Sequence, residues 1–314
     1  MHAFFHAVRV FFEHLAAVGW TALAVALLLH FVKIVLRTVA WRNILAASYP
    51  DRRVRWRGVF GAYVAGVGIN SVAPARGGDL VKLFLVKRRI PDSSYATLAP
   101  TLVVETVFDF VVASMLLIWA AAIGVLPSGQ VIRRLPSVDW AWFFRHPNAS
   151  LAIAGVIGAA VLLLLVVARQ RVEEFRARVA QGFAILQDRP RFVRQVVLWQ
   201  AASWVFRIAS VYWFLRAFHV DATLHNALLV QVVDSLSTLI PFTPGGAGTK
   251  QGLIVVTLSG EASRTALLSF SVGMNIALVA FNVVLGFAAI AVMARTLDWR
   301  RLARTAEAEA KARP

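Results

Sequence analysis

The stretch 240–250 reads Ile-Pro-Phe-Thr-Pro-Gly-Gly-Ala-Gly-Thr-Lys and interrupts a long apolar region of the chain. Its two prolines stop any helix, and its three glycines leave backbone N–H and C=O groups without helical partners. At membrane depth, irregular backbone is tolerated only where other protein covers it or where it lines a water-filled cavity. The break is therefore predicted to lie at a covered or hydrated place inside a membrane protein.

A weaker copy of the same pattern occupies 71–82, which reads Ser-Val-Ala-Pro-Ala-Arg-Gly-Gly-Asp-Leu-Val-Lys. When Pro74 is aligned with Pro241, both copies run from an apolar segment through Pro and Gly-Gly to a Lys eight or nine residues after the Pro. Matched helix breaks in the two halves of a membrane protein point to a transport site at a repeat interface. The two copies therefore predict an inverted repeat.

Composition places the chain among all-α polytopic membrane proteins, because 59% of its residues are hydrophobic and only 16% are charged. The chain has no cysteine, which excludes disulfides, thiol catalysis and cysteine-ligated metals. A formal net charge of +17 would also suit a nucleic-acid partner. Most of these cations, however, fall in predicted loops on one side of the membrane, where topology and anionic lipid explain them. We therefore expect no nucleic-acid partner.

The hydropathy pattern predicts a single transmembrane domain over 1–314. Its segments are an interfacial helix (1–17), a span (18–36), a basic loop (37–57), a hairpin (58–86), a span (96–124), an aromatic outer loop (125–149), a span (149–168), a basic amphipathic helix (169–194), a span (196–218), a second hairpin (224–258), a span (265–294) and a basic tail (295–314). The first repeat would cover 1–124 and the second 196–294, with 149–194 connecting them. The hairpin arms are short for a full crossing at about 1.5 Å per residue, which favours re-entrant hairpins; broken spanning helices are the alternative.

Lysine and arginine are distributed unevenly over these segments. They are concentrated in the proposed inner segments (37–57, 87–89, 169–194, 295–314) and are sparse in the proposed outer segments (1–17, 125–149, 218–223, 259–264). The positive-inside rule then predicts a cytoplasmic C-terminus. It also makes the two hairpins enter from opposite faces, as an inverted repeat requires.

Charged residues also fall inside the apolar segments, where a charge at the bilayer centre costs about 2.5–3.5 kcal/mol or more. Lys33 and Arg216 lie near the ends of predicted helices, so their side chains can snorkel to the interface. Glu105 and Asp109 are four residues apart and share a helix face. The charges that snorkelling leaves unexplained are Arg76, Asp79, Lys82, Glu105, Asp109, Arg207, Asp234 and Lys250.

Two interpretations of these charges remain open. One is a salt-bridge network that only holds helices together. The other is a polar cavity whose cations bind an anionic headgroup while the carboxylates orient those cations. In the second interpretation two Gly-Gly pairs open short helices whose N–H groups favour phosphate, although close helix packing is the alternative role: Gly77, Gly78, Gly245 and Gly246. Asn70 and Thr243 are further candidate substrate-binding residues of this cavity.

Other chemistries find no support in the sequence. The histidines are scattered without ligand spacing, so we expect no metal site, and no cofactor is indicated. A Walker-type phosphate loop, a nucleophile elbow and an HExxH motif are all absent from the sequence. ATP is therefore not indicated as an energy source.

The two glycine-rich motifs resemble those of a known family. Asn70 followed by Pro-x-Arg-Gly-Gly-Asp-x-x-Lys at 74–82, with Pro-x-Thr-Pro-Gly-Gly-x-Gly at 241–248, is similar to the lysylphosphatidylglycerol synthase transmembrane family, also called the flippase-like family. The similarity in size and hydropathy covers nearly the whole chain. It implies a multi-pass protein of the bacterial inner membrane that moves lipids or lipid-linked molecules between leaflets. Stand-alone members near hopanoid biosynthesis genes have about this length, which extends the implied substrates to hopanoids.

The chain also departs from the family pattern. Fused members carry a soluble aminoacyl transferase domain that charges phosphatidylglycerol with lysine, and no such domain follows before Pro314, so we expect this chain not to make lysyl-lipid. Many members have a Glu shortly after the second glycine-rich break, where this chain has Lys250 and Gln251. That departure suits a more anionic or differently shaped lipid.

The leading hypothesis is therefore a lipid flippase that is not an enzyme, with membrane lipids as ligands and lipid-synthesis proteins as further candidate partners. One alternative is an integral-membrane enzyme acting on a phospholipid or polyprenyl phosphate, with Glu105 and Asp109 as an acid–base pair or metal ligands. The other is a scaffold that organises lipid-synthesis proteins. The sequence does not indicate an oligomeric state.

Overall fold

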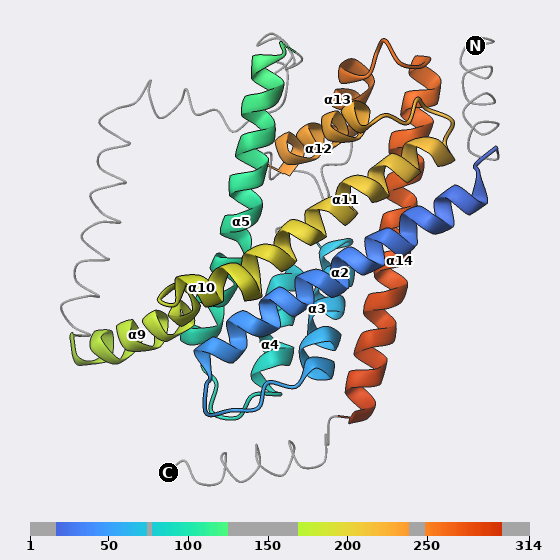
Figure 1. Cartoon of the computed structure of the whole chain (residues 1–314). Coiled ribbons are helices and arrows are strands. Elements are labelled where there is room, and N and C mark those ends of the chain that lie inside the picture. The colour runs from blue at the N-terminus through green and yellow to red at the C-terminus, as the bar shows by residue number, and fades with distance from the viewer. Residues whose placement is uncertain (1–16, 74–76, 125–168, 239–248, 297–314) are drawn as a thin grey trace, which may run out of the picture.

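The computed structural model describes residues 17–73, 77–124, 169–238 and 249–296, which form helices joined by turns (Figure 1). The prediction of an all-helical chain is confirmed for these residues. Within these described ranges, three helices are long and apolar enough to cross a membrane: α2 (Trp20–Ser48), α5 (Tyr95–Ala122) and α14 (Arg264–Thr296). The shorter helices are α3 (Trp56–Asn70), α4 (Gly77–Lys87), α9 (Arg169–Gly182), η2 (Ala184–Leu186), α10 (Arg189–Phe192), η3 (Val193–Val197), α11 (Leu198–Ala217), α12 (Leu224–Thr238) and α13 (Thr249–Thr257).

Some predicted segments lie outside the described residues. They are the interfacial helix up to residue 16, the Pro-x-Arg centre of the first break (74–76), the outer loop and the span within 125–168, the second glycine-rich break (239–248) and the tail from residue 297. The predicted spans 96–124 and 265–294 correspond to α5 and α14. The predicted span 196–218 corresponds to α11, which is not among the three helices that qualify as spans by length and composition.

The largest difference between the structure and the sequence prediction is the position at which α2 ends. The span was predicted to end at residue 36, with a basic loop over 37–57, but the helix continues to Ser48. Its sequence holds no Gly or Pro from Trp20 to Ser48, and the first helix breaker after it is Pro50. Arg37 and Arg42 therefore belong to a helix and not to a loop.

The two helices α2 and α11 pack side by side and run in opposite directions (Figure 1). The N–H of Gly19, just before α2, donates to the Ala217 carbonyl at the end of α11 over 2.8 Å. At the other end, Asn43 Nδ2 donates to the Gln195 carbonyl over 2.9 Å. This pair forms a frame against which the shorter helices are placed.

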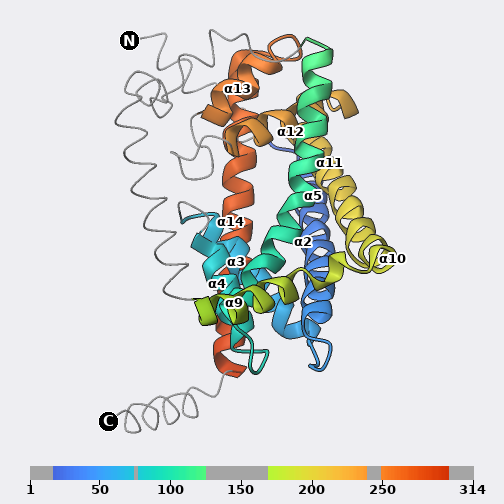
Figure 2. The same cartoon turned by 90° about the vertical axis from the view of Figure 1, so that its left-hand side faces the viewer.

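Two pairs of short helices lie toward opposite ends of the molecule. The helices α3 and α4 pack against each other toward the lower end, and α12 and α13 lie together at the upper end (Figures 1 and 2). They correspond to the arms of the predicted hairpins 58–86 and 224–258. The second break lies between α12 and α13, outside the described residues.

The apolar side chains form two separate cores. The lower core joins α3 and α4 to parts of the long helices that include Ile34 on α2, Val104 on α5 and Val196. The upper core joins α12 and α13 to other parts of the same frame, including Ala26 on α2 and Val211 on α11. Between these two cores, each long helix contributes side chains that form hydrogen bonds or ion pairs: His30 and Lys33 on α2, Asp109 on α5, Trp204 and Arg207 on α11, and Asn282 on α14. We call this level the polar layer.

Glycines bring two helices into backbone contact at α3 and α14. A Cβ atom on Gly68 would meet the Asn282 carbonyl oxygen and Gly286 Cα at 2.7 Å each, and a Cβ on Gly286 would meet Gly68 Cα at the same distance. Small residues allow such approach between membrane helices. Neither glycine has room for a side chain unless the two helices separate.

We predict that Gly68→Ala destabilises the protein by about 1–3 kcal/mol in free energy of unfolding, because the added methyl group overpacks the α3–α14 contact. The matched control is Gly252→Ala in α13, where a Cβ meets nothing within 4 Å and the change should gain up to about 1 kcal/mol of helix propensity. Thermal unfolding of both variants in detergent measures the difference. Equal melting temperatures for the two variants would contradict the contact.

Candidate functional site

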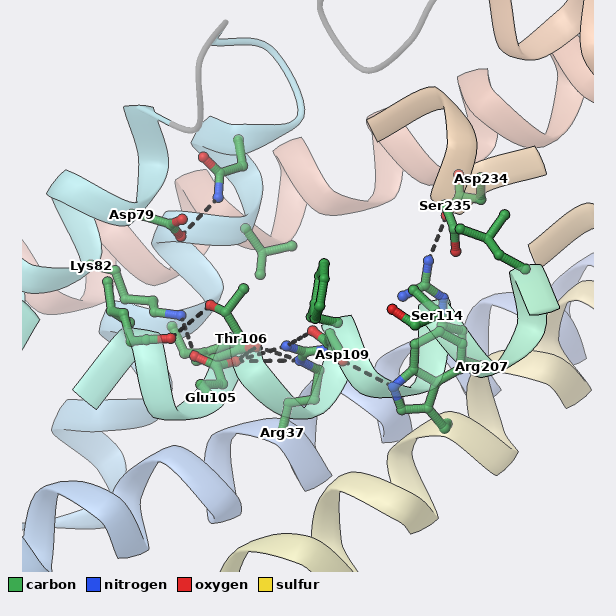
Figure 3. Close-up of a pocket in the computed structure, with 18 residues that line it drawn as sticks. Arg37, Asp79, Lys82, Glu105, Thr106, Asp109, Ser114, Arg207, Asp234 and Ser235 are labelled. Carbon is green, nitrogen blue, oxygen red and sulfur yellow. Dashed lines mark hydrogen bonds and ion pairs between the residues drawn. The ribbon is translucent and has the colours of Figure 1, made fainter. Parts of the chain in front are cut away.

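A cavity of about 390 Å³ lies at the polar layer, between α2, α3, α4, α5, α11 and α12. Its charged lining residues come from five helices, and Figure 3 shows them converging from both sides: Arg37, Asp79, Lys82, Glu105, Asp109, Arg207 and Asp234. We call it the central cavity. Six of these seven charges were predicted site residues, and the structure adds Arg37.

Arg37 forms the densest set of hydrogen bonds in the central cavity. Its guanidinium pairs with both oxygens of Asp109, with Nη1–Oδ1 at 2.9 Å and Nη2–Oδ2 at 2.6 Å. The same group also donates to Glu105 Oε1, from Nη2 at 3.0 Å. A planar guanidinium is suited to such bidentate binding, which fixes the orientation as well as the charge. Arg37 thereby joins α2 to α5 at the centre of the molecule.

Glu105 is the most completely bonded carboxylate of the cavity. Oε1 accepts from the Tyr63 hydroxyl at 2.6 Å as well as from Arg37, and Oε2 accepts from Lys82 Nζ at 2.9 Å. The Lys82 ammonium also lies over the rings of Tyr63 and Trp41, 4.1 and 4.7 Å from their centroids. Lys82 is therefore neutralised by Glu105 and enclosed by aromatic faces.

A second ionic cluster lies on the α11–α12 side. Asp234 pairs with Arg207 Nη2 at 2.5 Å through Oδ2 and with Lys250 Nζ at 2.6 Å through Oδ1. Trp204 connects this cluster to the first, because its indole N–H donates to Asp109 Oδ1 at 2.9 Å while Arg207 lies over its ring at 4.6 Å. One aromatic side chain thus contacts an anion of one cluster and a cation of the other.

A smaller cavity of about 220 Å³ lies on the other side of the Arg207–Asp234 pair, which lines both cavities. Its charged residues are three cations and one carboxylate: Lys33, Arg207, Lys250 and Asp234. We call it the cationic cavity. In the central cavity, by contrast, carboxylates outnumber cations among the described charged residues that line it.

Lys33 reaches the cationic cavity without a carboxylate partner in the described part of the chain. Its Nζ lies 3.2 Å from His30 Nδ1, and His30 Nε2 lies 2.9 Å from Asn282 Oδ1. Because an ammonium only donates, His30 accepts at Nδ1 and donates from Nε2, as a neutral ring does. Asn282 then donates to Ser71 Oγ at 3.1 Å, which carries the polar chain from α2 through α14 to the end of α3.

The structure also accounts for the first glycine-rich motif. Helix α4 begins at Gly77, as predicted, but the Gly78 N–H donates to Asn70 Oδ1 at 2.7 Å and is already occupied. A Cβ on Gly78 would collide with the Gly66 carbonyl oxygen, so Gly78 serves close packing of α4 on α3. Asn70 Nδ2 donates to Asp79 Oδ1 at 3.1 Å, which orients Asp79 toward the central cavity.

Of the remaining predicted site residues, one lies in the cationic cavity and the others lie outside the described residues. Lys250 lies in the cationic cavity and not in the central one. Arg76, Thr243, Gly245 and Gly246 lie outside the described residues. Within the described ranges, no three His, Asp or Glu side chains are grouped as metal ligands would be.

The sequence prediction missed several residues of the site. Arg37 was assigned to a loop and Lys33 to a helix end, although both lie well inside α2. The signal that would have found them is the lack of any Gly or Pro between Trp20 and Tyr49. Tyr63 and Trp204 carried no such signal, because their roles depend on partners from other helices.

We predict that Arg37→Gln destabilises the protein by about 3–5 kcal/mol, because it leaves the buried Glu105 and the half-buried Asp109 without their shared cation. The control is Arg52→Gln, which breaks the exposed Arg52–Asp92 pair and should cost about 0–1 kcal/mol. Chemical unfolding in detergent micelles measures both changes. A loss for Arg37→Gln no larger than that for Arg52→Gln would show that the cluster does not hold the fold together.

The chain is similar in sequence to known proteins. No solved structure matches the chain. The glycosyltransferase AglD of Haloferax volcanii is 28% identical over 282 residues, which covers 77% of this chain and 44% of that protein, so the chain spans less than half of that relative's length. The family described as lysylphosphatidylglycerol synthase TM region matches residues 3–286. Because that match covers nearly the whole chain, the protein is a multi-pass membrane protein and belongs to the lysylphosphatidylglycerol synthase transmembrane-region family.

Proposed function

We propose that the protein moves a lipid with an anionic headgroup from one membrane leaflet to the other. The observation that carries this proposal is the pair of adjoining cavities in the polar layer, which share Arg207 and Asp234. A polar headgroup needs such a hydrated path, because an unpaired charge in hydrocarbon is costly. A purely structural network would need the ion pairs but not the cavities beside them.

The central cavity has a wall that faces lipid. Thr106 and Phe110 of α5 line the cavity, and the Phe110 side chain is 67% exposed. Several other apolar side chains of the same helix are also exposed. A headgroup can enter here while its acyl chains stay against the outer face of α5. This geometry suits a lipid better than a water-soluble substrate.

The cationic cavity supplies the binding site for the phosphate of that headgroup. Three cations face one carboxylate there, so an anion is needed to balance the charge. Lys82 was predicted to bind the headgroup. Its ammonium is already paired with Glu105, so it instead stabilises the central cavity. The excess of cations favours a phosphorylated lipid over an uncharged hopanoid or isoprenoid.

Alternating access is a consistent mechanism for this proposal. The pairs α3–α4 and α12–α13 lie toward opposite ends, as two oppositely inserted re-entrant hairpins would. The polar layer lies between them, where inverted-repeat transporters bind their substrates. The arginine-rich turns beside α2 and α4 fit a cytoplasmic lower end in a bacterial inner membrane, with the C-terminus on the same side.

A second candidate function is chemistry on a lipid-linked substrate. It is favoured by the similarity to AglD, whose printed name is that of a glycosyltransferase, over most of this chain. In this case Glu105 or Asp109 would act as the base on a polyprenyl phosphate or phospholipid. Both carboxylates are held by Arg37 in the structure, which suits an ion pair better than a free base.

We predict that purified protein in proteoliposomes translocates a headgroup-labelled anionic phospholipid, and that Lys33→Gln reduces the rate at least tenfold while the protein stays folded. The reason is that Lys33 contributes a cavity cation without a carboxylate partner among the described residues, so its removal leaves no buried anion behind. The control is Lys87→Gln, which removes an exposed lysine at the end of α4. Its translocation rate should equal that of the wild type.

The outcomes of this experiment distinguish the role of the cationic cavity, lipid movement and chemistry on the lipid. Equal rates for Lys33→Gln and Lys87→Gln would contradict the role of the cationic cavity but leave lipid movement intact. Lipid recovered with a changed mass, and no movement, would favour the enzyme. Neither movement nor chemical change with anionic and neutral lipids would overturn the proposed function.

A further inference from the structure

A third cavity, of about 740 Å³, lies at the lower end of the molecule, away from the polar layer. It is formed by the turn between α2 and α3, the turn after α4 and the end of α14. Six of its lining residues are arginines: Arg52, Arg53, Arg55, Arg57, Arg88 and Arg89. We call it the arginine pocket.

The charge of the arginine pocket is largely uncompensated. Asp51 is the only carboxylate that lines it among the described residues. Arg52 pairs with Asp92 at 2.5 Å, whereas the side chains of Arg53, Arg55 and Arg57 have no hydrogen-bond or ion-pair partner within the described ranges. These three side chains are exposed and line the pocket. An anion with more than one negative charge is needed to balance them.

The pocket differs from an ordinary basic surface of a membrane protein. The positive-inside rule requires only that cations lie in the loops on one side. Helix α9 shows that ordinary case, because its arginines alternate with Glu173 and Glu174, and Arg178 pairs with Glu174. In the arginine pocket, two separate chain segments, 52–57 and 88–89, bring cations to one hollow. All of them are arginines, whose planar fork binds phosphate with two parallel hydrogen bonds.

The floor and outer wall of the pocket are apolar. Val59, Val86 and Met293 beneath it are each at most 5% exposed. Val292, on the outer wall, belongs to the candidate span α14 and is 63% exposed. Next to the pocket, Trp56 stacks on Phe60 with ring centroids 5.5 Å apart, and such aromatic residues are typical of the membrane interface.

We propose that the arginine pocket binds the phosphorylated headgroup of a membrane lipid that carries at least two negative charges. The headgroup contacts Arg53, Arg55 and Arg57 above the apolar floor, and the acyl chains lie along α14 beside Val292. The orphan N–H groups of the first turn of α3, whose N-cap Arg55 forms no side-chain cap, add to the positive potential. This site is separate from the transport path and does not depend on the proposed function.

The test is native mass spectrometry of the full chain with dioctanoyl phosphatidic acid, dioctanoyl phosphatidylcholine and pyrophosphate. Wild type should retain phosphatidic acid at least tenfold more tightly than phosphatidylcholine. The variant R53Q/R55Q/R57Q should lose at least tenfold of that affinity. The control R176Q/R189Q/R194Q removes the same number of exposed cations outside the pocket and should change the affinity less than twofold.

A charge-preserving variant separates a built site from simple attraction. R53K/R55K/R57K keeps the net charge but loses the bidentate geometry, so its affinity should fall at least threefold. Unchanged affinity in this variant, or equal losses in the two glutamine variants, would overturn the proposal. Pyrophosphate binding as tight as that of phosphatidic acid would also overturn it, because it would identify a soluble ligand. Both cavities of the polar layer keep their cations in every variant, so they do not account for a difference.

Discussion

The fold depends on charged residues that lie between two apolar cores, where every carboxylate of the network has a hydrogen-bond or ion-pair partner. Arg37 makes this possible, because one guanidinium holds both carboxylates of α5 while its own helix continues through both cores. A charge at this depth is costly by itself, and a bidentate pair recovers much of that cost. The helices α2, α5 and α11 are therefore linked at a level where apolar packing alone would not specify their register.

The polar layer is asymmetric in charge, and this asymmetry separates structural from functional cations. On the α5 side, Arg37 and Lys82 are matched by Glu105 and Asp109. On the α12 side, Asp234 is shared by two cations and Lys33 lies close by. The first half resembles a network that stabilises the fold. The second half has more cations than carboxylates, and we propose that this excess balances the charge of a ligand; Trp204 connects the two halves.

Much of this arrangement followed from the sequence, because charges in apolar segments are conspicuous. In this way Glu105, Asp109, Arg207 and Asp234 were singled out, and the structure places all four in ion pairs or hydrogen bonds of the polar layer. The helical class was predicted from the hydrophobic composition, and the two pairs of short helices from the Pro- and Gly-rich breaks. The end of α2 was predicted wrongly, since its arginines were taken as a sign of a loop when the absence of Gly and Pro favoured a helix. The hydrogen bonds of Tyr63 and Trp204 were out of reach, because aromatic residues are common in membrane helices and only the fold selects their partners.

The contact between Gly68 and Gly286 has a mechanical consequence. Where two backbones touch, no side chain lies between them that could change rotamer to let one helix slide along the other. A displacement of α3 would therefore move α14 with it. Because α14 also reaches the upper core and contacts α13, such a displacement would be transmitted along α14 to the other pair of short helices.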